Sequence, residues 1–145
     1  MRAHLRGVAR WCAALLAAVM APSSARACRC IEPRTTAAAY RSAALVVAGK
    51  VVDVVPRPEV QGFTYRVRVS RAWKADAARE ISVSTGTDCS FEAERGREYL
   101  LFLLPEAGSG MTTGRCMGNG VLESKRGALG WLDRRGRRGR VMPAR

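Results

Sequence analysis

The sequence predicts a mainly β protein: a five-stranded OB-fold barrel with short flanking helices and two disulfides. Runs of β-branched and aromatic residues recur between turn-rich stretches, and five of these runs are typical of strands. A short five-stranded chain leaves no exposed edges if it closes into a barrel. Four cysteines follow residue 27, an even number that favours two disulfides. A small two-sheet sandwich is the alternative fold.

The first 27 residues are typical of a secretory signal peptide. Three early arginines precede an apolar stretch at residues 11–21, which is too short to span a bilayer. Residues 25–27 (Ala-Arg-Ala) then form a small-x-small cleavage site, so that Cys28 becomes the first residue of the exported chain. We expect a secreted protein, extracellular or periplasmic. Lipid attachment at Cys28 is the alternative, although Arg26 stands where such sites favour a small residue.

The exported chain is long enough for one domain, which we place at residues 28–132. The net charge of the whole chain is +13. Residues 125–145 hold eight basic residues and one acid, whereas residues 28–124 are nearly balanced. Because residues 133–145 (DRRGRRGRVMPAR) are poor in apolar side chains, we expect them to form a disordered basic tail.

The first elements follow from local patterns. An alanine-rich stretch at residues 35–42 predicts a short helix capped by a threonine. The β-branched run 44–55 predicts a long strand, and Gly49 in its middle predicts a bulge or bend. Residues 56–62 read as a loop. Residues 63–73 alternate, with Phe63, Tyr65, Val67 and Val69 on the buried face.

Three further strands are expected at residues 81–85, 98–104 and 111–116. The second of these is apolar throughout, which indicates a central strand. Residues 121–132 predict a helix that two glycines weaken.

The four cysteines after residue 27 are Cys28, Cys30, Cys89 and Cys116. A Cys28–Cys30 bond would be strained, because extended residues at i and i+2 lie about 6.5 Å apart. Two pairings remain, 28–89 with 30–116 or 28–116 with 30–89. Zinc binding by four thiolates is a poor match to the usual paired ligand spacing. The simplest interpretation is that the two disulfides only stabilise the fold.

The only histidine, His4, lies in the predicted signal peptide. The exported chain therefore lacks the histidine that Ser-His-Asp and Cys-His catalysis and most zinc sites require. We expect neither an enzyme nor a bound cofactor.

The order of these features carries a family resemblance. Cys28-x-Cys30 follows the predicted cleavage site, a strand ends near Cys89, residues 95–101 read Arg-Gly-Arg-Glu-Tyr-Leu-Leu, and Cys116 comes later. Over residues 28–124 this resembles the N-terminal domain of the tissue inhibitors of metalloproteinases and, more broadly, a netrin-like module. The resemblance implies an OB-fold with the pairs Cys28–Cys89 and Cys30–Cys116.

The resemblance also implies an inhibitory edge. In that family the α-amine and carbonyl oxygen of the first cysteine, here Cys28, bind the zinc of a target metalloprotease. The residue between the cysteines, here Arg29, enters the adjacent specificity pocket, and the loop at Thr87 and Asp88 packs beside it. Arg29 departs from the small hydroxyl residue of the family, and a buried guanidinium costs several kcal/mol unless an acid meets it. A non-inhibitory extracellular binding module is therefore the alternative function.

Other surface features have simpler interpretations. Arg66 and Arg68 lie on the wet face of a predicted strand, so we expect no specific nucleic-acid binding. The basic tail suits an acidic surface polymer through charge, or it has no partner at all. Glu92, Glu94 and Glu98 are read as surface charges, and the two tryptophans Trp73 and Trp131 as packing residues. We expect a monomer.

Overall fold

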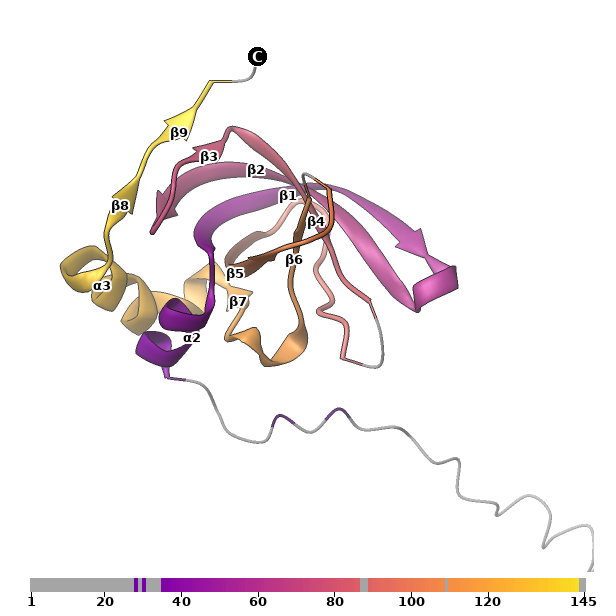
Figure 1. The fold of residues 1–145 in the computed structure, drawn as a ribbon, viewed down its shortest axis with the longest axis horizontal. Helices are drawn as coiled ribbons and strands as arrows, with labels where there is room; N and C mark the ends of the chain where they lie inside the picture. Colours follow the sequence, from indigo (N-terminus) through magenta and orange to yellow (C-terminus); the bar gives the residue numbers. More distant parts are fainter. Residues whose placement is uncertain (1–27, 29, 31–34, 87–88, 109, 144–145) are drawn as a thin grey trace, which may run out of the picture.

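The computed structural model describes residues 28, 30, 35–86, 89–108 and 110–143. The predicted signal peptide, Arg29, Thr87 and Asp88 lie outside the described residues. The chain is mainly β and folds into a five-stranded barrel with two helices against one side, as Figure 1 shows. The fold class predicted from the sequence is confirmed, and both disulfides are present.

The elements follow one another along the chain with short connections. The helices are α2 Thr36–Ser42 and α3 Arg126–Arg135, and the 3-10 segments are η1 Pro58–Val60, η2 Arg115–Met117 and η3 Leu122–Lys125. The strands are β1 Leu45–Arg57, β2 Gly62–Trp73, β3 Ala77–Ala78, β4 Glu80–Ser84, β5 Glu98–Pro105, β6 Met111–Thr112, β7 Gly120–Val121, β8 Arg138–Gly139 and β9 Val141–Met142.

Five strands close the barrel. The order is β1-β2-β4-β6-β5, and β5 returns to pair with β1, so the sheet has no free end. The pairing of β4 with β6 is parallel and the other four contacts in the ring are antiparallel. This closed order with a single parallel contact is the OB-type barrel that the sequence predicts.

The bend in β1 is at the predicted glycine. The register between β1 and β2 shifts at Ala48/Gly49. A Cβ on Gly49 would lie 2.7 Å from the backbone oxygen of Arg68, so only glycine allows the two strands this close. The bend lets β1 pair with β5 over residues 45–50 and with β2 over residues 46–57.

Two apolar clusters lie on opposite faces of β1 and β5. The first fills the barrel with alternate residues such as Val47, Tyr65 and Leu101. The second lies outside the barrel, where Val46, Leu100 and Phe102 pack under α2 and α3 together with Trp73 and Leu132. The helices therefore explain why β5 is apolar throughout, and Trp73 is a core residue as expected.

Several predicted boundaries shift. The capped helix is present, since Thr35 accepts a hydrogen bond from the Ala38 amide. The predicted loop 56–62 is shorter, because β1 runs to Arg57 before a single 3-10 turn. The fifth strand was expected to reach Cys116 but covers only Met111–Thr112, and Cys116 lies in η2.

The expectation of a disordered tail from residue 133 was wrong for residues 133–143. Helix α3 continues to Arg135, β8 pairs with β2, and β9 pairs with β3. The segment buries little apolar surface, as its composition indicated, but its backbone pairs with the barrel and its arginines find acids and carbonyl oxygens. We call residues 136–142 the C-terminal strap. Among the described residues, no helix is both long enough and apolar enough to cross a membrane.

Candidate functional site

The two disulfides gather the sequence-predicted cysteines at one edge of the barrel. Cys28 is bonded to Cys89 and Cys30 to Cys116, the pairing that the resemblance implied. The bridges lie side by side, because the sulfurs of Cys28 and Cys116 are 4.0 Å apart. Cys28 is half-buried and Cys30 is exposed. The bonded sulfurs also exclude a site made of four zinc thiolates.

The segment that carries Cys116 is held by one amide side chain. Asn119 accepts a hydrogen bond from the Phe102 amide at 2.8 Å. Its Nδ2 donates to the Thr113 hydroxyl at 2.7 Å and to the Gly114 carbonyl at 2.8 Å. Since Phe102 belongs to the central strand β5, Asn119 fixes the loop 113–119 to the most buried part of the fold.

The segment after Cys89 is held by two buried tyrosines. The Tyr65 hydroxyl donates to the Phe91 carbonyl at 2.8 Å and accepts from the Ala93 amide at 3.1 Å. The Tyr99 hydroxyl accepts from the Glu94 amide at 2.9 Å. Burial raises the pKa of the Tyr65 hydroxyl, so this group stays protonated and keeps its donor role across the physiological range.

The segment before Cys89 is held by Thr85. The Thr85 hydroxyl accepts from the Phe63 amide at 3.1 Å, and the Thr85 amide donates to the Phe63 carbonyl at 2.8 Å. Gly62 makes this contact possible, because a Cβ there would lie 1.9 Å from the Thr85 carbonyl oxygen. The chain therefore leaves the barrel at a fixed point, two residues before Thr87 in the sequence.

The two disulfide-bearing segments also touch each other. The Arg115 amide donates to the Cys89 carbonyl at 2.9 Å. The Arg115 guanidinium lies 3.7 Å from the carboxylate of Glu92, with both side chains largely exposed. A surface pair of this kind contributes about 0–1 kcal/mol, so the backbone contact and the disulfides position the edge.

If the chain is cut after Ala27, as the sequence predicts, the chemistry available at this edge is that of an N-terminus held by disulfides. Within the described part of the chain, no three His, Cys, Asp or Glu side chains are grouped so that they could hold a metal ion. The paired cysteines leave the backbone of residue 28 as the reactive group of the predicted edge. An α-amine and a neighbouring carbonyl oxygen could then act as ligands to a metal that a partner brings.

Sequence reasoning missed the side chains that support the edge. Tyr65 and Tyr99 carried a usable signal, because a tyrosine on the buried face of a strand needs a partner for its hydroxyl. Asn119 lies between Gly118 and Gly120 and reads as an ordinary turn residue. Its role depends on the approach of β5, which no local pattern indicates.

Comparison of the sequence with protein families and with curated sequences identifies no relative. No protein-family model matches the chain, and no curated protein sequence matches it significantly. The evidence for the fold and for the disulfide pairing therefore comes from the structure alone.

Proposed function

We propose that the protein, once it begins at Cys28, inhibits a zinc endopeptidase through the α-amine and carbonyl oxygen of that residue. The observation that carries the proposal is the pair of adjacent disulfides, Cys28–Cys89 and Cys30–Cys116. They tie residues 28 and 30 to two segments that buried side chains hold to the barrel. A held N-terminus loses little conformational freedom when it binds, which lowers the cost of association.

The chemistry of such a target suits an amine. A catalytic zinc has three protein ligands and keeps a fourth position for water or substrate. An α-amine has a pKa of about 8, so a useful fraction is neutral near neutral pH and offers its lone pair. Displacing the zinc-bound water by this amine removes the nucleophile that the protease needs.

Arg29 restricts the choice of target. The residue between the cysteines enters the pocket beside the zinc in the proposed complex. A guanidinium there requires a carboxylate partner, because an unpaired buried charge is strongly destabilising. The target is therefore a zinc endopeptidase whose pocket is acidic and that accepts basic residues.

The experiment is an inhibition assay on a panel of zinc endopeptidases with acidic and apolar pockets. The protein starting at Cys28 is compared with the same protein carrying one extra alanine before Cys28, with disulfides intact in both. The proposal predicts inhibition of the acidic-pocket enzymes and its loss in the extended protein. Equal inhibition by both proteins would disprove chelation through the amine.

An Arg29→Ser variant adds a test of the pocket. We expect it to lose potency against acidic-pocket enzymes and to gain potency against apolar-pocket enzymes. An unchanged ranking of targets would show that residue 29 does not enter the pocket.

A second candidate function is a non-inhibitory extracellular binding module. Arg29 is the observation that favours it, since its charge excludes apolar pockets. Under this function every protease on the panel stays active with either N-terminus. The two disulfides then serve only to stabilise the barrel in the oxidising environment that they indicate.

A further inference from the structure

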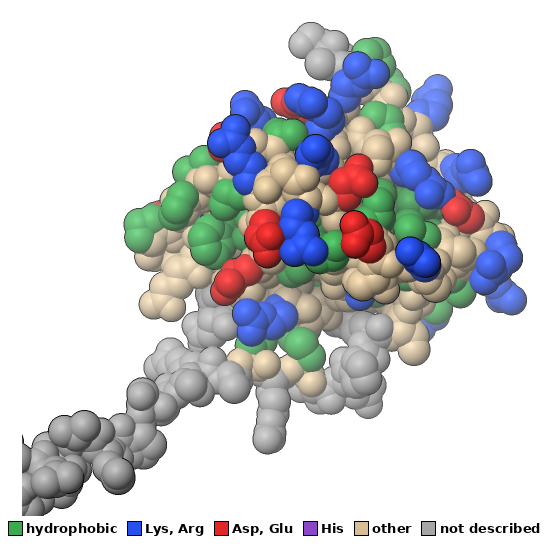
Figure 2. All heavy atoms as spheres, turned by 180° about the vertical axis from the view of Figure 1, so that it is seen from behind, with side chains coloured by type: hydrophobic (Ala, Val, Ile, Leu, Met, Phe, Trp, Pro, Cys, Tyr) green, Lys and Arg blue, Asp and Glu red, His purple; other side chains and the backbone are tan. Residues whose placement is uncertain are grey.

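Charge is unevenly distributed over the described residues. We define the basic edge as residues 71–76 and 133–140 together with Arg41. It contains eight basic and two acidic residues, whereas the remaining described residues contain ten basic and eight acidic ones. In Figure 2, Lys and Arg side chains crowd the upper and right margins, whereas most acidic side chains lie near the middle of that face. The excess positive charge is therefore local.

Contacts between side chains hold the parts of the basic edge together. Asp133 accepts a hydrogen bond from the Arg71 guanidinium and lies 3.8 Å from that of Arg138. The Arg71 guanidinium also lies 4.8 Å from the ring centre of Trp73. Lys74 donates to the Tyr40, Arg41 and Ala43 carbonyls, which end α2. The edge thus spans α2, β2, α3 and the C-terminal strap.

The strap is an ordered segment, and two of its glycines lie where a side chain would clash. A Cβ on Gly139 would lie 1.8 Å from the Ala75 carbonyl oxygen, and one on Gly136 would lie 2.7 Å from that of Leu132. Both glycines of the RRGRRGR sequence therefore lie at points where backbone segments come too close together for a side chain. The residue after each glycine pairs with the barrel: the Arg137 carbonyl accepts from the Lys74 amide at 2.6 Å and the Arg140 carbonyl from the Ala77 amide at 2.9 Å.

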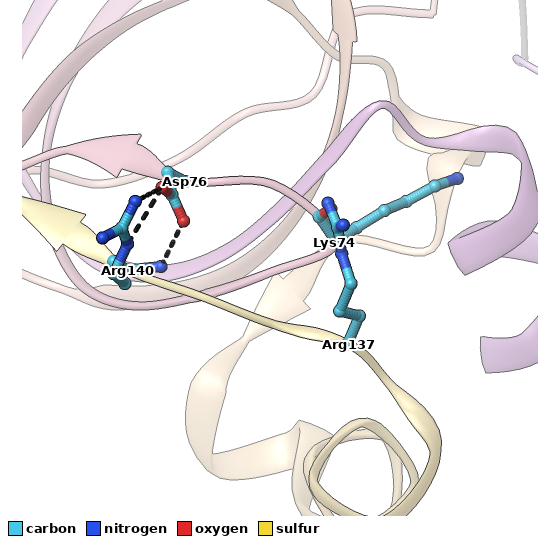
Figure 3. Close-up of polar contacts among 4 residues, drawn as sticks. All are labelled: Lys74, Asp76, Arg137 and Arg140. Atoms are coloured by element: carbon cyan, nitrogen blue, oxygen red, sulfur yellow. Dashed lines mark hydrogen bonds and ion pairs between the residues drawn. The ribbon is translucent and has the colours of Figure 1, made fainter.

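Arginine side chains add contacts between the strap and the barrel and still leave exposed charge. Asp76 accepts from the Arg140 amide at 2.8 Å and from the Arg140 guanidinium at 2.8 Å and 3.1 Å (Figure 3). The Arg137 guanidinium donates to the Lys74 carbonyl at 3.1 Å. The Arg138 and Arg140 side chains are still 74% and 80% exposed. Arg134 and Arg135 are exposed and form no ion pair with a described residue.

The composition of the edge selects the class of partner. Guanidinium groups bind carboxylate, sulfate and phosphate through two parallel hydrogen bonds, and seven of the eight cations are arginines. A membrane-inserting surface needs exposed apolar residues, but Met142 is the one large apolar side chain exposed near this edge among the described residues. Single-stranded nucleic acid needs exposed aromatic rings, and Trp73 is buried while Tyr40 packs edge-on against Trp131.

We infer that the basic edge is a docking surface for an acidic polysaccharide, independent of the disulfide edge and of the proposed inhibition. The disulfides indicate an oxidising environment, where anionic sugar polymers are accessible partners and nucleic acid is not the usual one. The strap presents its guanidinium groups on a fixed backbone, so binding a repetitive polyanion requires little ordering of the protein.

The test measures the affinity of the disulfide-bonded protein starting at Cys28 for polygalacturonate, a carboxylated polysaccharide, at several salt concentrations. The variant Arg134→Gln/Arg135→Gln removes two exposed charges from the edge. The matched control, Arg66→Gln/Arg95→Gln, removes two exposed charges elsewhere. We expect the first variant to lose about tenfold in affinity and the control to change less than twofold. Equal losses in both variants, or no binding by the unmodified protein, would overturn the proposal.

Two further arms test the class of partner and the role of the strap. Tighter binding to phosphatidylglycerol vesicles or to duplex DNA at the same salt concentration would overturn the assignment to a polysaccharide. Gly139→Ala keeps every charge but displaces the strap, so we expect a several-fold loss of affinity. Unchanged affinity in this variant would show that the ordered strap is not the binding element.

Discussion

The first and last segments that the structure describes are tied to the same barrel by different means. At the disulfide edge, two covalent bonds hold residues 28 and 30, and the supporting contacts come from the barrel: Asn119, Tyr65 and Tyr99. The described residues of the basic edge include no cysteine, and the strap is held by backbone pairing, two close-approach glycines and ion pairs. A disulfide therefore fixes its segment at single points that neighbouring contacts support, whereas the strap depends on contacts spread along its length.

Removing one disulfide should have the largest effect on stability. The double variant Cys30→Ser/Cys116→Ser opens a bridge with a sequence separation of 86 residues. The chain-entropy model predicts a loss of about 3–4 kcal/mol in the free energy of unfolding, with the other bridge intact. Chemical denaturation of the variant and the parent protein gives the value. A loss below about 1 kcal/mol would mean that the disulfide edge is held mainly by its non-covalent contacts.

A smaller effect is expected from the contact that supports Cys116. Asn119→Ala leaves the Phe102 amide, the Thr113 hydroxyl and the Gly114 carbonyl each short of a partner. We expect a loss of about 1–3 kcal/mol in unfolding free energy, measured by denaturation. The control Ser124→Ala removes an exposed hydrogen bond and should change stability by less than about 0.5 kcal/mol. Equal effects of the two substitutions would show that Asn119 does not support the segment that carries Cys116.

Two glycine substitutions test whether the close approach of Gly139 holds the strap at the basic edge. Gly139→Ala introduces a Cβ against the Ala75 carbonyl, so the strap must move away. The amides of Ala77 and Arg79, which donate to strap carbonyls, should then exchange hydrogen about tenfold faster. Gly127→Ala in α3 has open space around its Cβ and should stabilise the protein by about 0.5–1 kcal/mol. Unaltered exchange in the Gly139 variant would contradict the role of its close approach.

The smallest expected effect is a pH dependence confined to the strap. Hydrogen bonds from the Arg140 side chain and amide lower the pKa of Asp76 from its ordinary value of 3.8. The folded-state pKa is depressed, so this stabilisation is present above about pH 4 and is lost as the pH falls through the lower, folded value. The protection factor of the Ala77 amide, which removes the intrinsic pH dependence of exchange, should therefore be constant from pH 7 to 5 and fall below pH 4. A transition near neutral pH would show that a titratable group other than Asp76 controls how the strap is held.

Local patterns predicted the barrel well. Alternation in β2, the apolar run of β5 and the bend at Gly49 each follow from side-chain size and polarity, which the sequence displays directly. Backbone geometry left two possible pairings of the four cysteines, and the family resemblance implied one of these two. These features depend on the residues themselves or on their near neighbours.

The strap and the supporting contacts were not predictable in the same way. Arg137 and Arg140 look solvated by composition, and their partners Lys74 and Asp76 are more than 60 residues away in sequence. Gly139 looks like a flexible linker residue, although it fills a site where a side chain would clash. Asn119 likewise acts on β5 across the fold. Each depends on a tertiary approach that the local sequence does not encode.

The proposed inhibition requires a mature chain that begins at Cys28, with a free α-amine beside two disulfides. Intact-mass measurement of the exported protein, followed by non-reducing peptide mapping, tests it most directly. The account predicts a mass that begins at Cys28 with an unmodified amine, four oxidised cysteines and the linked pairs Cys28–Cys89 and Cys30–Cys116. A chain that begins elsewhere, an acylated or lipid-modified Cys28, or a different pairing would contradict it.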